Sequence, residues 1–379
     1  MEKVGRLEKK IFNEILDGKD YSLTEAAIVF SGVNDTKDVK RYLEKYQKII
    51  DDVHRYVDVT GQKSLFEDNT LKLKIIYNSL NNSKLGRYLP GQFLFSKAID
   101  LQTSDVPDEA VGDCRALTYL TTTVANDMGV KGLNILESKD HMKNSLNIGN
   151  QRQITIENNN PNGFMDKEAK GFRKRNIDFI LPYLLYSRAA ENNSKDPELA
   201  IEQSTMAIGL CKDFGEAYIN RAIGRINTDK NEQYKLAIQD LETAQDLGYE
   251  DVEVYLNLGK AFSKMKDNEK ALLNLDTAMQ IDSMYPNIHL EKGKIFYSLG
   301  NFDKALKEFE SESDISVNQE LYDYIVKTNF RLGNIDSDEF QKHFESKNRI
   351  YKSNHDMMKG IEQEDGEYFC EFGGDYQNE

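Results

Sequence analysis

Apolar residues in the first hundred positions recur with the spacing of amphipathic helices. In the clearest stretch, residues 39–53, they follow the i, i+3, i+4, i+7 pattern and leave the other face charged. Ser22 and Glu25 form a capping box before the apolar run 26–30, which predicts the start of another helix. Proline and glycine residues then interrupt the pattern between 89 and 112. We therefore expect a helical leader followed by an irregular segment.

The pattern changes again after residue 112. A helix is expected to begin near Asp113 and to end before Gly129, because the apolar residues between them fall on one side. From Gly132 onward the alternation has a period of two, which predicts strands at "GLNILESK", "HMKNSLNI" and "RQITIE". The last two are expected to form a hairpin with its turn at Gly149 and Asn150. This part of the chain is thus predicted to be α+β.

Two further segments differ in composition from their surroundings. Residues 161–176 are rich in turn-forming residues and locally basic, so we interpret them as a linker. The basic cluster 173–175 could form an anion site, but a solvated loop is the favoured interpretation. Residues 351–379 are strongly acidic and are expected to form a disordered tail, although a docking motif there is an alternative.

Between these two segments the chain repeats itself every 34 residues. Four anchors recur at that distance: Gly259 with Gly293, Phe262 with Phe296, Ala271 with Ala305, and Leu275 with Phe309. Small residues allow two antiparallel helices to approach closely, and the larger ones fill the space beside them. One anchor departs from the pattern, because the position that matches Ala278 holds Glu312. We expect a looser unit at that point.

The period and its anchors resemble the tetratricopeptide repeat, which implies an all-α solenoid of four to five helix pairs over residues 177–350. In that fold the first helix of each pair lines the concave side, and such arrays bind proteins or peptides. The resemblance makes Asn220 and Asn257 candidates for gripping an extended peptide backbone through their amide groups. The alternative is that both are ordinary solvated helix residues.

Composition narrows the possible partners. The 379 residues carry a net charge of −15, which disfavours nucleic acid and anionic membranes because both require a basic face. No signal peptide and no apolar run long enough to span a bilayer is evident, so we expect a cytoplasmic protein. Three cysteines predict no disulfide framework, the histidines lack metal-ligand spacing, and no phosphate-binding glycine motif is present. Accordingly, neither a metal nor a cofactor is predicted.

Cys114 is the candidate for chemistry. It falls in the first turn of the helix expected from Asp113, where unpaired backbone N–H groups and the helix dipole stabilise a thiolate. A nucleophilic cysteine also needs a base, usually histidine, and a group that orients the base. The alternative is a small apolar core residue. Cys211 and Cys370 have no comparable neighbours and are interpreted as structural and exposed, respectively.

The hairpin pattern supplies the two partners. If the apolar residues of both strands enter one core, His141 and Glu157 share the opposite face. This register requires an odd loop, and it sets Glu157 across from Lys143 and diagonal to His141. Asn159 has the same parity and is the second candidate, whereas a slip of one residue would present Asn158 instead.

These residues resemble the core of the transglutaminase-like superfamily, which is papain-like: "GDCRALTYLTTTVANDMGV", a histidine that opens a strand, and "ITIEN" on the next strand. The resemblance covers about residues 22–160 and is most specific in 111–157. It implies that Cys114 is the nucleophile, His141 the base and Glu157 the orienting carboxylate, with Gln92 as a candidate oxyanion donor. The sequence departs from the family in using Glu for the commoner Asp and in lacking an aromatic residue shortly after the histidine.

Together these features predict a transglutaminase-like domain with a helical leader (1–160), a linker (161–176), a tetratricopeptide array (177–350) and an acidic tail (351–379). The first functional hypothesis is a thiol enzyme that acts on peptide or glutamine-type amides by hydrolysis or acyl transfer, with the repeats holding a protein substrate. The alternative is a non-catalytic interaction protein that retains a vestigial thiol domain.

Overall fold

The computed structural model describes residues 3–83, 94–104, 111–138, 141–148, 153–158, 163–166, 171–316 and 318–335. Gln92, Asn159, Cys370 and the predicted tail 351–379 lie outside these ranges. The chain divides into two compact units, Met1–Glu250 and Asp251–Glu379. In the described ranges, no helix combines the length and the apolar character that crossing a membrane requires.

The first unit begins with helices α1 (Arg6–Leu16), α2 (Leu23–Phe30), α3 (Thr36–Thr60), α4 (Asn69–Ser83) and α5 (Phe95–Gln102), with a short 3₁₀ helix η1 (Lys63–Glu67) before α4. The predicted helix start is confirmed, since the Ser22 side chain accepts the N–H of Glu25. Along α3 the predicted apolar face is the buried one. The helical leader therefore follows the pattern of its apolar residues.

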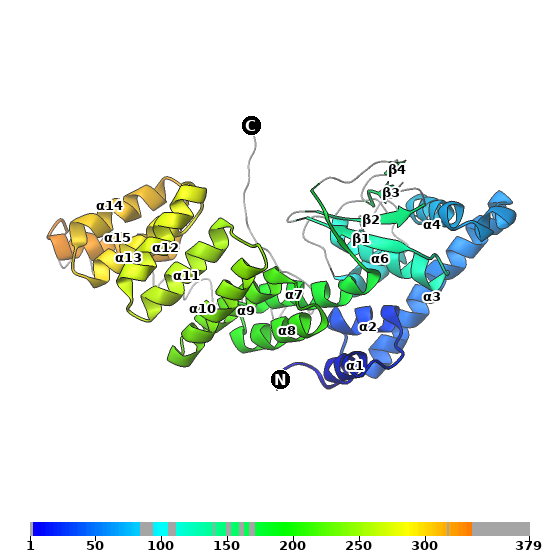
Figure 1. Ribbon diagram of the computed structural model, residues 1–379, viewed down its shortest axis with the longest axis horizontal. Coiled ribbons are helices and arrows are strands. Elements are labelled where there is room, and N and C mark those ends of the chain that lie inside the picture. Colours follow the sequence, from blue (N-terminus) through cyan, green and yellow to red (C-terminus); the bar gives the residue numbers. More distant parts are fainter. Residues whose placement is uncertain are drawn as a thin grey trace, which may run out of the picture. The chain divides into compact units, whose positions relative to one another are not determined.

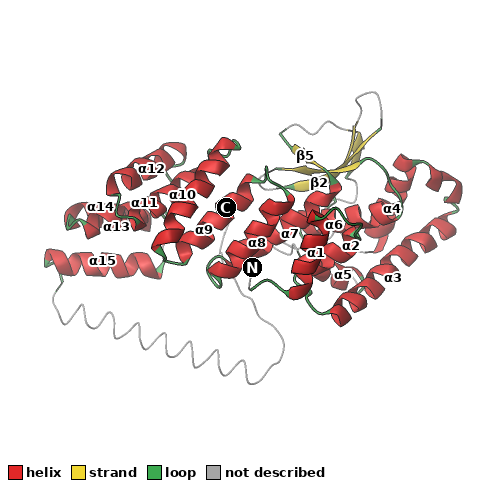
Figure 2. Cartoon of the chain, turned by 60° about the horizontal axis from the view of Figure 1, so that its bottom comes forward, coloured by secondary structure: helices red, strands yellow, loops and turns green. Residues whose placement is uncertain are grey.

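Helix α6 (Cys114–Asp127) packs beside a five-stranded antiparallel sheet (Figures 1 and 2). The strands are β1 (Leu133–Glu137), β2 (Met142–Asn147), β3 (Gln153–Ile156), β4 (Phe164–Asp166) and β5 (Arg173–Arg175), in the order β4-β3-β2-β1-β5. In β2 and β3, Met142, Leu146, Ile154 and Ile156 are buried in the core. The predicted α+β character of this region is confirmed.

The interpretation of residues 161–176 as a linker is wrong, because this segment supplies β4 and β5, the two edge strands. Arg175 explains part of the error. Its guanidinium is 8% exposed and lies 2.9 Å from the Glu137 carboxylate on β1 and 2.6 Å from that of Asp213. The cluster 173–175, expected in a solvated loop, thus includes a buried ion pair that holds an edge strand.

Four further helices complete the first unit: α7 (Ile180–Asn192, preceded by the 3₁₀ turn η2, Ile177–Phe179), α8 (Pro197–Leu210), α9 (Gly215–Asn227) and α10 (Asn231–Asp246). They form two antiparallel pairs. Helix α7 also packs against α2, and its Leu184 shares one hydrophobic core with Phe30, Leu117 and Phe214. The boundary expected near 176 therefore does not separate two cores.

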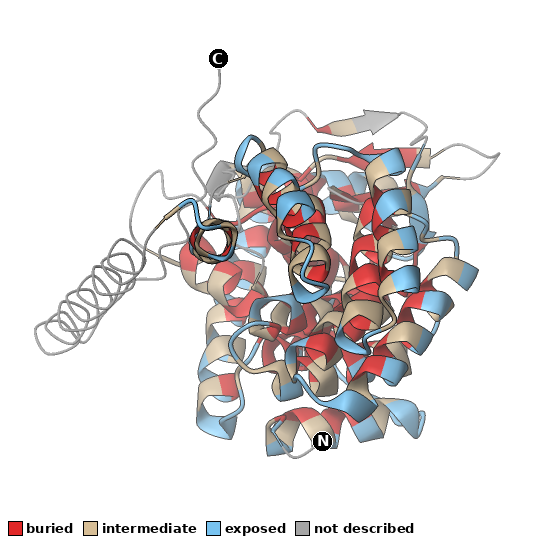
Figure 3. Cartoon of the chain, turned by 90° about the vertical axis from the view of Figure 1, so that its left-hand side faces the viewer, coloured by how far each residue is buried: buried red, intermediate tan, exposed pale blue. Residues whose placement is uncertain are grey.

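The second unit contains α11 (Val252–Lys264), α12 (Asn268–Ile281), α13 (Ile288–Ser298), α14 (Phe302–Ser313) and α15 (Gln319–Leu332). Buried and exposed residues alternate along these helices, as amphipathic packing requires (Figure 3). A Cβ at Gly259 would lie 2.6 Å from Leu275, and one at Gly293 would lie 2.3 Å from Phe309. The recurring glycines are thus confirmed as points of close helix approach.

Glu312, the residue that departs from the repeat pattern, has a defined role in the packing. Its side chain is fully buried, and its carboxylate accepts the N–H of Asn287 at 2.7 Å and that of Leu290 at 3.3 Å. The Ser316 hydroxyl donates to the same carboxylate at 2.7 Å. A negative charge at the N-terminus of α13 satisfies free N–H groups and complements the helix dipole. The unit is therefore not looser at this point, contrary to expectation.

We predict that Glu312→Ala destabilises the protein although alanine matches the repeat pattern. The loss is expected to be about 1–3 kcal/mol, because buried N–H groups at the start of α13 lose their acceptor. Thermal and urea unfolding would measure it. The matched control is Glu310→Ala, since Glu310 is exposed on the same helix. Equal stability of the two variants would contradict the capping role.

Candidate functional site

Cys114 is the first residue of α6, as the sequence predicted for its first turn. The preceding Asp113 caps the helix, and its Oδ1 accepts the N–H groups of Arg115 at 2.9 Å and Ala116 at 3.0 Å. Asp113 Oδ2 binds the Arg115 guanidinium, with 2.8 Å to Nε and 2.5 Å to Nη2. Cys114 itself is 6% exposed. The cap fixes the start of the helix and with it the position of the thiol.

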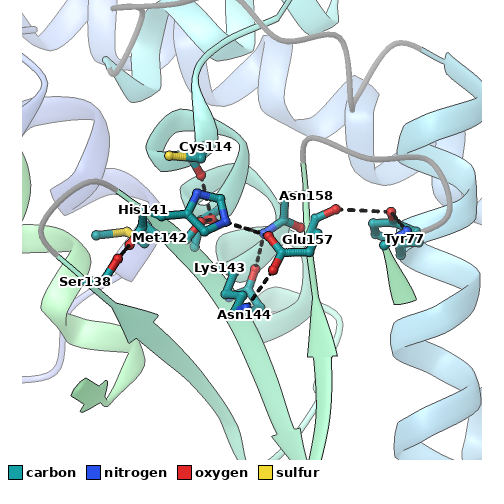
Figure 4. Close-up of polar contacts among 11 residues, drawn as sticks. Tyr77, Cys114, Ser138, His141, Met142, Lys143, Asn144, Glu157 and Asn158 are labelled. Carbon is teal, nitrogen blue, oxygen red and sulfur yellow. Dashed lines mark hydrogen bonds and ion pairs between the residues drawn. The ribbon is translucent and has the colours of Figure 1, made fainter. Parts of the chain in front are cut away.

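The hairpin has the register that the sequence predicted. Asn144 pairs with Ile156, which places Glu157 opposite Lys143. The His141 Nε2 atom lies 2.5 Å from Glu157 Oε2, and Lys143 Nζ lies 2.6 Å from Glu157 Oε1. Figure 4 shows the three side chains converging next to Cys114. Among the residues described, His141 is therefore partnered by the carboxylate of Glu157 and not by the amide of Asn158.

The electrostatics of the site follow from these contacts. The neighbouring Cys114 side chain, and then the hydrogen bond to Glu157, raise the pKa of His141 to about 9, against the opposing effect of partial burial. Burial alone would raise the pKa of Glu157, but hydrogen bonds from His141 and Lys143 outweigh it and lower that pKa. Glu157 is thus an ionised carboxylate between two cationic groups at neutral pH.

The sequence did not identify two aromatic residues at this site. The Phe172 ring meets His141 edge-on at 6.1 Å between centroids, and Lys143 Nζ lies 4.1 Å from the centre of the same ring. The Tyr77 hydroxyl donates to the Glu157 carbonyl oxygen at 3.3 Å and accepts the N–H of Gly163 at 3.0 Å. Phe172 thus brings an aromatic ring to His141, although none of the residues shortly after the histidine is aromatic. No local pattern in the sequence marks either residue.

The backbone of His141 is also held. Its carbonyl oxygen accepts the N–H of Ser138 at 2.9 Å and the Ser138 hydroxyl at 3.2 Å. Ser138 follows the last residue of β1, so these bonds tie the start of β2 to the end of its neighbour. Three contacts therefore hold the imidazole in position: the bonds of its own backbone to Ser138, the Glu157 carboxylate and the Phe172 ring.

The predicted peptide-binding residues lie on helices α9 and α11. Asn220 is 7% exposed, and its amide donates to the Tyr186 carbonyl at 3.1 Å and accepts from the Asn193 amide at 3.2 Å. Asn257, 5% exposed, donates to the Glu253 carbonyl at 2.9 Å within α11. Neither is an ordinary solvated residue, and these bonds favour a packing role. Peptide binding by the two asparagines stays a prediction.

Chemically, the arrangement has the parts of an activated nucleophile: a thiol at a helix N-terminus, an imidazole beside it and a carboxylate on the imidazole. Within the part of the chain that the structure describes, no three His, Cys, Asp or Glu side chains are grouped so that they could hold a metal ion.

Comparison with known proteins identifies the repeats. A family model described as "Tetratricopeptide repeat" matches residues 252–283, which span α11 and α12. No protein of curated function matches the sequence. The chain is largely helical, with tetratricopeptide-like helical repeats and a small antiparallel sheet.

Solved structures that are similar to the chain include the following three. A thermophilic tetratricopeptide repeat protein of Thermus thermophilus is 15% identical, with 41% of this chain and 89% of that one covered and a TM-score of 0.36. MamA protein is 20% identical, with 43% and 88% covered and a TM-score of 0.33. Menin, in a structure that reveals its binding site for the Mixed Lineage Leukemia protein, is 12% identical, with 85% and 81% covered and a TM-score of 0.44.

We predict that Cys114→Ala and Glu157→Gln each lower the pKa of His141 from about 9 towards 6.5, because each removes a group that stabilises the imidazolium. An NMR titration of the His141 ring would measure this, with Cys211→Ala as the control that should leave the titration unchanged. Since the folded-state value is raised, the stability that His141 contributes is fully present below about pH 6.5 and is lost as the pH rises through 9. A His141 titration that is the same in all variants would contradict the contacts.

Proposed function

We propose that the first unit is a thiol enzyme of the transglutaminase-like type, which acts on the carbonyl group of a peptide or glutamine-type amide. One observation carries the proposal: the His141 imidazole lies next to Cys114, whose side chain raises its pKa, while its Nε2 atom lies 2.5 Å from the Glu157 carboxylate. A cysteine, a histidine and a carboxylate in this order form the relay that activates a nucleophile and returns the proton. The resemblance of residues 111–157 to that superfamily supports the same assignment.

In the proposed reaction, the Cys114 sulfur attacks the amide carbon while the thiol proton resides on His141. His141 then donates this proton to the departing amine, so that the C–N bond breaks and a thioester remains on Cys114. Water, or an amine, attacks the thioester with His141 as the base and releases a carboxylic acid or a new amide. Glu157 keeps the imidazole in orientation and stabilises its positive charge.

Neighbouring groups suit these steps. Asp113 takes up the N–H groups of Arg115, Ala116 and Leu117, so the backbone N–H of Cys114 is the proposed donor to the negatively charged carbonyl oxygen, and Gln92 remains a candidate for a further donor. Lys143 keeps Glu157 ionised, because protonation of the carboxylate would break its 2.6 Å ion pair. The chemistry requires Cys114 in its reduced form, which favours a reducing compartment such as the cytoplasm.

The alternative is a non-catalytic tetratricopeptide scaffold, and two observations favour it. The family match lies within the repeats, a class of structure that mediates protein–protein binding. In addition, Cys114 is only 6% exposed, as a core cysteine would be. In the enzyme proposal the repeats hold a protein substrate; in the alternative they bind a protein or peptide partner and the site is vestigial.

We predict that iodoacetamide modifies Cys114 at least about 10-fold faster than Cys211 in the folded protein at pH 7. Cys114 combines a helix N-terminus with a histidine, whereas burial, followed by a hydrogen bond to Asp213, raises the pKa of Cys211 to about 12. Peptide mapping by mass spectrometry after brief labelling would separate the two rates.

The matched variants are His141→Asn, which should remove the advantage of Cys114, and His289→Asn, which changes a histidine in the second unit and should preserve it. If Cys114 reacts no faster than Cys211, or if His141→Asn leaves its rate unchanged, the enzyme proposal fails and the scaffold alternative stands.

A further inference from the structure

We propose that Thr118 is a positioning residue of this site, whose hydroxyl sets the distance between the cysteine helix and the two strands that carry His141 and Glu157. The inference rests on the proposed function. Thr118 lies one helical turn after Cys114 and is fully buried. It touches none of the reacting atoms, so its effect is exerted through the backbone and the side chains next to them.

One oxygen atom joins all three elements of the site. Thr118 Oγ1 lies 2.6 Å from the carbonyl oxygen of Cys114 and 3.1 Å from that of Met142, and it accepts the Asn158 amide at 3.0 Å. Met142 follows His141 in the chain, and Asn158 follows Glu157. The hydroxyl therefore contacts Cys114 itself and the residue that follows each of the other two members of the proposed triad.

A bond from a helical threonine to the carbonyl four residues earlier is commonplace and indicates nothing by itself. Thr122 makes it to the Thr118 carbonyl at 2.7 Å, and Thr123 makes it to the Tyr119 carbonyl at 3.0 Å. Thr118 differs because the same oxygen also contacts β2 and the residue that follows Glu157. A hydroxyl has one proton and two lone pairs, so it can share the proton between two carbonyls while it accepts the amide.

A second layer of buried amides supports the hydroxyl. The Asn158 amide also donates to Asn144 Oδ1 at 2.9 Å, and the Asn144 amide donates to Thr122 Oγ1 at 2.7 Å. Asn144 is fully buried and Asn158 is 1% exposed. Hydrogen bonds between buried groups are stronger than those in water, so the network holds the strands in one place relative to α6. Figure 4 shows Asn144 and Asn158 next to Glu157.

This network matters for chemistry because proton transfer depends on sub-ångström placement of the donor and the acceptor. Without the hydroxyl, the start of α6 loses its contacts with both strands at the same point. The thiol and the imidazole are then no longer held in a fixed position relative to each other, although each element keeps its own secondary structure.

The test compares the full-length wild type with Thr118→Val, Thr118→Ser and Thr123→Val. Thr123 is the matched control, because it is fully buried on the same helix and its hydroxyl donates to the carbonyl oxygens of Tyr119 and Leu120 in that helix. Two quantities are measured for each protein: the rate of Cys114 alkylation by iodoacetamide against pH, and the NMR titration of the His141 ring. Thermal unfolding is recorded alongside, and Thr118→Ala replaces the valine variant if that protein does not fold.

For Thr118→Val we expect a loss of about 10-fold in alkylation rate at pH 7 and a His141 titration that moves down from about 9. Thr118→Ser should restore both to within about twofold, since it keeps the hydroxyl. Thr123→Val should leave both unchanged even if it lowers the unfolding temperature.

Wild-type behaviour in Thr118→Val, or an equal loss in Thr123→Val, would overturn the positioning role. The two proposals fail separately. If wild-type Cys114 is unreactive, the thiol-enzyme proposal fails, and the His141 titration still decides whether Thr118 holds the imidazole against the cysteine helix.

Discussion

The register of the β2–β3 hairpin is the constraint on which the site depends. With Asn144 opposite Ile156, Glu157 reaches His141 and, one residue later, Asn158 turns to α6 and meets Thr118. A shift of one residue would turn both side chains to the opposite faces of the sheet, so that an amide faced the imidazole and the Glu157 carboxylate faced the buried layer under α6. That layer has no cation to pair with a carboxylate among its described members Thr118, Thr122 and Asn144, so burial there would be costly. The buried network thus enforces the register that the proposed chemistry needs.

The first two helix pairs are part of the same folded unit as the site. Helix α7 shares the hydrophobic core, and Arg175 on β5 pairs with Glu137 on β1 and with Asp213, which lies between α8 and α9. Glu137 is 5% exposed, and removing one partner of such a buried pair typically costs about 3–5 kcal/mol. Phe172, which packs on His141, directly precedes this strand. Sheet, site and adjoining repeats therefore depend on one another for stability.

Where a period persists over several residues, the sequence predicts the structure well: the buried face of α3, the Cys114 helix, the hairpin register and the 34-residue repeat are all found. Strands β4 and β5 have three residues each, too few for a period, and they are held by pairing and by the Arg175 ion pairs. Phe172 and Thr118 act through tertiary contacts that leave no local pattern. The core that α7 shares with the rest of the first unit does have a signal in the sequence. Residues 180–185 of α7 are apolar on every side of the helix, as is typical of a helix inside a core, and all six are buried.

The proposed function requires that Cys114 is a nucleophile activated by His141. It is tested most directly with a glutamine-containing peptide in which the side-chain amide is replaced by an electrophilic diazoketone, followed by intact-mass measurement and peptide mapping. We expect one covalent adduct, on Cys114, in the wild type, and its loss in His141→Asn with the fold retained. An adduct that forms equally in His141→Asn, or none on Cys114 at any concentration that labels free thiol, would contradict the account and leave a protein whose function resides in its repeats.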